Sequence, residues 1–116
     1  MTPDFSTVTA NTAAKVPANR IVFWHAELPP LDMRTISEHA LEANSIRVHT
    51  HLEFTGELWD FCYESLMAEA RRRLEQEVAR LGGRCAHVLS ESVMPQHDER
   101  RGEGWLHGQF TYALLA

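Results

Sequence analysis

Two pairs of residues in this sequence have side chains and a spacing that suit a metal ion. His49 and His51 are separated by one residue, and so are Cys85 and His87. Because side chains alternate along a β-strand, each pair would present both of its groups on one face of a sheet. Imidazole nitrogens and cysteine thiolates are common ligands of zinc and related metals. These four residues are therefore candidate ligands of a divalent transition metal, which is the one cofactor that the sequence suggests without identifying it.

Neither pair makes a complete metal site by itself. A zinc site needs three or four protein ligands, so the pairs would have to combine across strands or across subunits. The spacings match no strong motif such as CxxC or HExxH. The sequence favours the alternative that both pairs are ordinary strand residues. His49 and His51 would then lie on a solvated polar face, and Cys85 and His87 on a mixed face or at a subunit contact.

No set of residues in the sequence forms a recognisable catalytic motif. A GxSxG nucleophile turn is absent, and Gly82-Gly83 follows a helical segment instead of preceding one, so it does not form a phosphate loop. Cys62 is predicted to be a packed thiol. We therefore expect a non-enzymatic protein with no catalytic residues. The enzymatic alternative is a site at a subunit interface, with a histidine such as His87 or His107 as base.

The composition narrows the class of partner and the compartment. The chain has 116 residues, which suits one domain, with 16 acidic and 11 basic residues and a net charge of -5. This balance argues against a broad nucleic-acid surface and against anionic membranes. Two cysteines are too few for a disulfide framework, and neither a membrane span nor a signal peptide is recognisable. We expect a cytoplasmic protein that binds neither nucleic acid nor membrane.

Hydrophobic periodicity predicts the elements that must position these residues. Residues 1–19 have little to bury and are predicted to be a disordered or loosely docked tail, followed by a single α+β domain over residues 20–116. Strands are predicted over residues 20–25, 35–43 and 46–53, and again over 84–94 and 105–115, with a polar loop over 95–103. One long amphipathic helix is predicted over residues 55–81.

The last two predicted strands form a hairpin whose register follows from their apolar residues. Pairing Val88 with Tyr112, and Ala86 with Leu114, joins the apolar side chains into one surface for the helix. The same register, continued without interruption, places His107 opposite Val93. The predicted fold class is thus α+β, with an antiparallel or mixed sheet of about five strands and one long helix, about 55–81, packed on one face.

Several apolar residues do not fit this arrangement in a lone subunit. Phe61 falls on the helix side away from the apolar stripe, and Leu89, Val93 and Ala113 fall on the predicted uncovered face of the sheet. A half-apolar face without a cover needs a partner. Self-association into a homo-oligomer is the expected explanation, and the alternative is that the N-terminal tail folds over this face.

The stretch from about residue 35 to the C-terminus resembles the YbjQ family, small bacterial proteins of unknown function that often carry a heavy-metal-binding label. The segments that carry the resemblance are Tyr63-Glu64-Ser65-Leu66-Met67-Ala68-Glu69-Ala70-Arg71 and Leu81-Gly82-Gly83-Arg84-Cys85-Ala86-His87-Val88. The resemblance implies an α+β subunit in a closed ring, with a pentamer as the implied size. It implies no reaction, and its metal label transfers to no particular residue here.

The sequence therefore leads to three functional hypotheses. The first is a self-assembling, non-enzymatic binding module of the YbjQ type for a small ligand or protein partner. The second is a metal-binding protein that uses His49, His51, Cys85 and His87 across strands or subunits. The third is a small enzyme with an active site at a subunit interface.

Overall fold

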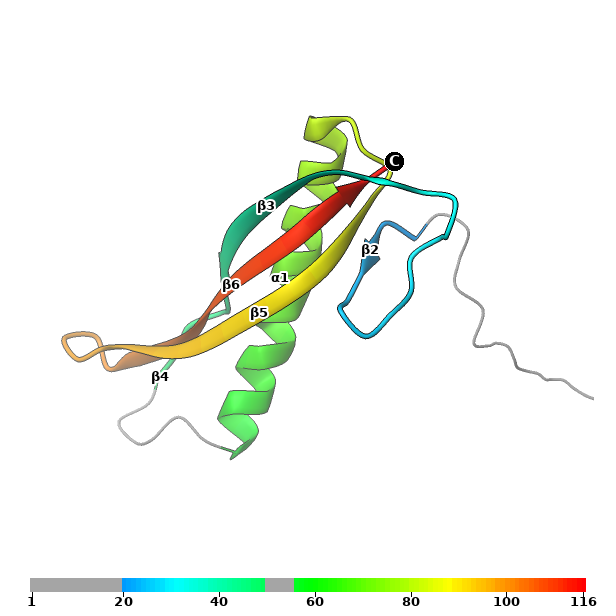
Figure 1. Ribbon diagram of the computed structural model, residues 1–116. Helices are drawn as coiled ribbons and strands as arrows, with labels where there is room; N and C mark the ends of the chain where they lie inside the picture. Colours follow the sequence, from blue (N-terminus) through cyan, green and yellow to red (C-terminus); the bar gives the residue numbers. More distant parts are fainter. Residues whose placement is uncertain (1–19, 50–55) are drawn as a thin grey trace, which may run out of the picture.

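The computed structural model describes residues 20–49 and 56–116, and in them one helix packs on a five-stranded mixed sheet (Figure 1). This confirms the predicted α+β fold class. The predicted tail over residues 1–19 lies outside the described residues. The elements in chain order are β2 (Val22–Phe23), β3 (Thr35–Asn44), β4 (Val48–His49), α1 (Gly56–Leu81), β5 (Cys85–Asp98) and β6 (Glu103–Leu115).

Helix α1 is the long amphipathic helix that the apolar periodicity predicts. Its buried side chains recur every four residues and face the sheet: Cys62, Leu66, Ala70, Leu74 and Val78. The helix ends at Leu81 because Gly82 adopts a left-handed conformation with φ of 77°. The amide of Gly83 donates to the carbonyl of Val78 (3.0 Å), and Gly82 to that of Ala79 (3.4 Å). These bonds form a Schellman cap.

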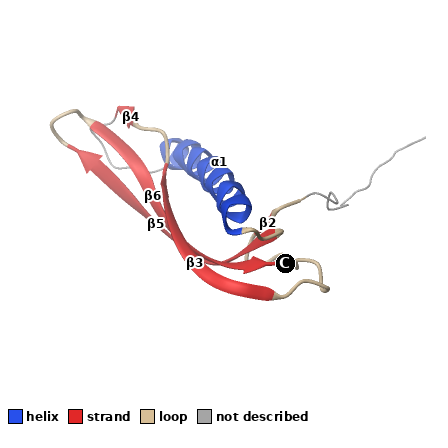
Figure 2. Cartoon of the chain, turned by 90° about the horizontal axis from the view of Figure 1, so that it is seen from above, coloured by secondary structure: helices blue, strands red, loops and turns tan. Residues whose placement is uncertain are grey.

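The sheet has the order β2-β5-β6-β3, and β4 also pairs with β6. Strand β2 is parallel to β5, whereas every other pairing is antiparallel. Figure 2 shows α1 on one side of a curved sheet, and Figure 1 shows the β5–β6 hairpin extending beyond β2 and β3. The strand predicted over 20–25 is only Val22–Phe23, and that over 46–53 is Val48–His49, with residues 50–53 outside the described part.

The polar loop predicted over residues 95–103 is wrong. Strand β5 continues through Pro95 to Asp98, and β6 starts at Glu103, so only four residues turn the chain. Pro95 is tolerated because its partner on β6, Leu106, makes no backbone hydrogen bonds to β5. The Leu106 amide donates to Ser45 Oγ (2.8 Å), and the Leu106 carbonyl accepts from the Ser45 amide (2.9 Å). The nitrogen of Pro95 therefore points to the open edge of β5, where no donor is needed.

The predicted hairpin register holds at one end and shifts at Leu89. Val88 pairs with Tyr112 as predicted, but Ser90 is the next paired residue, opposite Thr111. A β-bulge at Leu89 therefore reverses the faces of the following residues. His107 pairs with Met94, so its predicted pairing with Val93 is wrong. The bulge brings Val93 to the helix side, where it packs against the core.

The second face of the sheet differs from the predicted half-apolar surface. Val93 does not lie on it, and Ala113 is only 4% exposed in a small cluster with Phe23, Cys85 and Leu115, against which Met33 packs. The chain's own segments therefore cover one end of this face. Elsewhere the face carries mostly polar side chains from three strands, among them Glu38, Glu42, Asn44, Ser90, Ser92, His107, Gln109 and Thr111. Phe61, as predicted, is exposed on the outer side of α1.

Candidate ligand-binding site

The predicted metal ligands lie at opposite ends of the sheet. His49 pairs with Glu103 at the start of β6, whereas Cys85 pairs with Leu115 at its end. These partners are 12 positions apart (115 − 103), or about 40 Å along the strand at about 3.3 Å per residue. His51 lies outside the described residues. A single chain thus does not bring His49 to Cys85 and His87.

The environment of Cys85 also opposes metal binding. Its thiol is buried and donates a hydrogen bond to the carbonyl of Arg20 (3.7 Å), and burial raises its pKa. Metals bind the thiolate, which this burial disfavours. His87 lies on the same face, and its Nε2 is buried without a hydrogen-bond partner among the described residues. In residues 20–49 and 56–116, no three His, Cys, Asp or Glu side chains form a group that could hold a metal.

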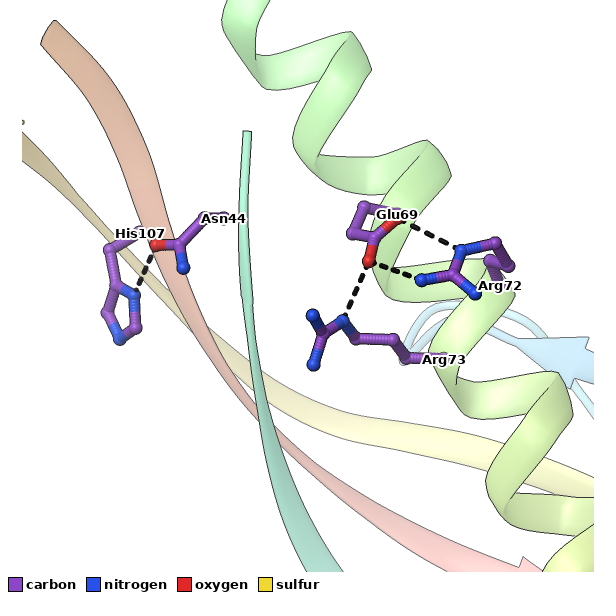
Figure 3. Close-up of polar contacts among 5 residues, drawn as sticks. All are labelled: Asn44, Glu69, Arg72, Arg73 and His107. Carbon is purple, nitrogen blue, oxygen red and sulfur yellow. Dashed lines mark hydrogen bonds and ion pairs between the residues drawn. The ribbon is translucent and has the colours of Figure 1, made fainter. Parts of the chain in front are cut away.

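His107, the other histidine considered as a base, is held by its neighbours on the face opposite α1. Its Nδ1 lies 2.8 Å from the side-chain oxygen of Asn44 (Figure 3), and its Nε2 lies 3.2 Å from a carboxylate oxygen of Glu42. Both ring nitrogens therefore face oxygen acceptors within the chain. This arrangement anchors β3 to β6 and leaves neither nitrogen directed at a substrate.

The outer surface of α1 carries an ion-pair network that is complete in itself. Glu69 accepts hydrogen bonds from both Arg72 and Arg73 at 2.7–3.1 Å (Figure 3), and these bonds lower the pKa of its carboxyl to about 2. About two turns after Glu69, Glu77 pairs with Arg80 at 2.7 Å. These five charged groups are matched with one another within the helix, so they are not available to a ligand.

A different group of side chains meets where α1 crosses β5. The hydroxyl of Tyr63 donates to Glu91 Oε2 (2.8 Å), and His25 Nε2 lies 3.2 Å from Oε1 of the same carboxylate. The side chain of Glu91 is 21% exposed. Burial, together with the adjacent carboxylate, raises the pKa of Tyr63 to about 12. The tyrosine thus remains a neutral donor to a carboxylate that is largely shielded from water.

The turn that follows β2 holds Trp24 next to this group. The amide of Trp24 donates to the Glu27 side chain (2.8 Å), and the amide of Glu27 donates back to the Trp24 carbonyl (2.7 Å). Arg20 forms an ion pair with Glu27, and its hydrogen bond is the main cause of the lowered pKa of that carboxyl. The indole also packs against Phe110, with ring centroids 6.3 Å apart. Backbone, charge and ring contacts together fix its position.

A pocket of about 390 Å³ lies between this turn and the flank of α1. Its volume is within the range of small-molecule sites. Its lining combines apolar side chains with one acidic and one basic group: Trp24, Tyr63, Glu64, Met67, Ala68 and Arg71. These residues come from one helix face and from a turn far away in sequence. The pocket thus combines apolar and charged side chains from two separate parts of the chain, which makes it a candidate ligand-binding site.

Sequence reasoning missed this site because it depends on the bulge at Leu89. With uninterrupted alternation, Glu91 falls on the face opposite the helix, away from Tyr63. A signal was present in the sequence: Val88 and Val93, both apolar, are five residues apart and so cannot share a face in a regular strand. Trp24, which follows a strand of only two residues, gave no comparable signal.

Comparisons with known proteins identify no family and no similar protein for this chain. No protein-family model matches the chain, and no curated protein or solved structure is significantly similar to it. Within residues 20–49 and 56–116, no helix is both long enough and apolar enough to cross a membrane.

Proposed function

We propose that this protein is a non-enzymatic, self-assembling binding module of the YbjQ type, with a ring of sister chains as its working form. The observation that carries the proposal is the open outer edge of β3, a ten-residue strand at the end of the sheet. An exposed edge of this length is a template for a further strand. The proposed contact is therefore a sheet edge, and not the uncovered sheet face that the predicted positions of Leu89, Val93 and Ala113 favoured.

The backbone of β3 is arranged so that its outer edge offers regularly spaced groups. The backbone of Leu106 forms hydrogen bonds with Ser45, and Ala116 exchanges two backbone hydrogen bonds with Arg34 (2.9 and 3.0 Å). Along β6, every second residue therefore directs its backbone amide and carbonyl towards β3. Their partners His39 and Leu41 must therefore bond β6. The amides and carbonyls of the intervening residues, Glu38, Ala40 and Glu42, then point outward. No described strand pairs with them.

Strand β5 supplies a second, different edge. Beyond the short contact with β2, its outer side has no partner among the described strands. The bulge at Leu89 and the missing amide of Pro95 interrupt this edge, so it can accept a strand only over a limited length. A head-to-tail ring requires two different edges on each subunit, because the β3 edge of one subunit then pairs with the β5 edge of the next.

The test is the mass of the protein in solution. By light scattering at micromolar concentration, the wild type should have a mass at least twice the 13.2 kDa of one chain. Ala40→Pro removes an outward amide and should give a folded 13.2 kDa monomer. Leu41→Pro, one position away, removes an amide that bonds β6 and should instead lower the melting temperature. A wild-type protein that is monomeric would overturn the proposal.

The metal-binding and enzymatic hypotheses receive no comparable support. A metal site would need a second subunit to bring His49 and His51 to Cys85 and His87, and the buried Cys85 thiol would have to lose its proton. An interface enzyme would need an accessible histidine as base, whereas His107 is held by Asn44 and Glu42, and Nε2 of His87 is buried. A binding role, by contrast, has a formed pocket beside Trp24.

A further inference from the structure

We propose that the pocket between α1 and the turn after β2 binds a small apolar molecule with a carboxylate at one end and an ammonium group at the other. A free tripeptide with apolar side chains is the simplest example. This inference rests on the proposed role as a binding module. It does not rest on assembly, because every residue that lines the pocket belongs to one chain.

The middle of the pocket is suited to an apolar body. The half-buried indole of Trp24 forms one wall, and Met67 and Ala68 of α1 form part of the other. The hydroxyl of Tyr63 is already committed to Glu91, so this residue offers mainly its ring. Methionine is flexible and polarisable, and it adapts to ligands of irregular shape. Apolar side chains of a ligand would therefore lose water against Trp24 and Met67.

The charged groups lie towards different ends of the same helix flank. Glu64 and Arg71 are seven residues apart, which is about two turns and about 10 Å along the axis at about 1.5 Å per residue. Neither side chain forms a hydrogen bond or ion pair with another residue in the described ranges. The charge of Arg71 helps to lower the pKa of Glu27, but the ion pair of Glu27 is with Arg20. Glu91 is held by Tyr63 and His25. Arg71 is thus available to a carboxylate, and Glu64 to an ammonium group.

The spacing of these charges selects the length of the ligand. An extended peptide rises about 3.3 Å per residue, so three residues span about 10 Å between the terminal groups. The pocket volume of about 390 Å³ can hold a molecule of this class. The C-terminal carboxylate would meet Arg71, and the N-terminal ammonium would meet Glu64.

Calorimetric titration with trileucine, its C-terminal amide and its N-acetyl derivative tests each charge separately. Free trileucine should bind most tightly, and blocking either terminus should weaken binding by about threefold to tenfold. Arg71→Gln should weaken binding of the free peptide by a similar factor but should not weaken binding of the amide further. Glu64→Gln should behave in the same way towards the N-acetyl peptide.

Arg72→Gln is the matched control, because Arg72 is the next residue on α1 but is paired with Glu69. It should leave all three affinities unchanged. Equal affinity for the three peptides, equal weakening by the two arginine variants, or no binding of trileucine to the wild type would each overturn the inference. Light scattering on the same samples separates the two proposals: an oligomer that binds no trileucine removes only this inference, and a monomer that binds it removes only the assembly.

Discussion

Tyr63 of α1 donates a hydrogen bond of 2.8 Å to Glu91 of β5, and this contact joins the helix to the sheet beside the candidate pocket. It exists because the bulge at Leu89 turns Glu91 to the helix side. The wall of the pocket therefore depends on an irregularity in one strand. A regular hairpin would keep the same core residues up to Val88 but would lose the contact between Tyr63 and Glu91.

The ionisation of Tyr63 reports this contact directly. Its pKa is raised to about 12, first by burial and then by the hydrogen bond to Glu91, whereas tyrosine normally ionises near 10. In a Tyr112→Phe variant, which leaves one tyrosine, absorbance of tyrosinate should therefore show Tyr63 ionising near pH 12 in the folded protein. Glu91→Gln keeps an acceptor but removes the negative charge, so it should lower this pKa. Because the folded pKa is the higher one, stability from this contact should be lost as pH rises from about 10 to 12. A midpoint of 10 in the folded Tyr112→Phe protein would refute the contact.

The bulge should matter more than the side chain that occupies it. Deleting Leu89 restores regular alternation and would turn Glu91 and Val93 away from the helix, so we expect a loss of about 3 kcal/mol or more in the free energy of unfolding. Leu89→Ala keeps the bulge and alters a side chain that is 42% exposed, so its effect should be within about 1 kcal/mol. Urea unfolding measures both. A deletion variant as stable as the wild type would show that the register is not fixed in this way.

Gly108 of β6 is packed tightly against the core. A Cβ atom there would lie 2.7 Å from the Phe110 ring and 3.1 Å from Leu66. Gly108→Ala should therefore destabilise the protein by about 1–3 kcal/mol through overpacking. Gln109→Ala, at the exposed neighbouring position, should change stability by less than about 0.5 kcal/mol. Equal thermal stability of the two variants would contradict the described packing of the helix on β6.

Acid should weaken the fold through carboxylates whose pKa values are lowered. The pKa of Glu69 falls from 4.5 to about 2 because Arg72 and Arg73 donate to it, and that of Glu27 is lowered mainly by Arg20. A lowered folded pKa gives stability that is complete above 4.5 and is lost as pH falls towards 2. Melting temperature should therefore decrease over this range, and Glu69→Gln should reduce the decrease slightly, since exposed pairs contribute about 1 kcal/mol or less. An identical pH profile for this variant would show that the network does not form.

Strong, regular patterns in the sequence were sufficient to predict much of the fold. The apolar stripe and the two glycines define α1, and the pairing of Val88 with Tyr112 follows from matching apolar side chains. Residues 95–103 were predicted to be a polar loop, whereas β5 continues to Asp98, because sequence alone does not show that the nitrogen of Pro95 faces an open edge. The contacts around Trp24, Tyr63 and Glu91 join residues far apart in the chain, and they depend on the bulge, so local patterns could not predict them.

Amide hydrogen exchange along β3 tests self-assembly through the sheet edge most directly. We predict that the amides of Glu38, Ala40 and Glu42 become more slowly exchanging as protein concentration rises, because they bond a neighbouring subunit. Those of His39 and Leu41, which bond β6, should stay protected at every concentration. If Glu38, Ala40 and Glu42 exchange as freely as unprotected amides at all concentrations, β3 has no partner strand and the proposed assembly is wrong.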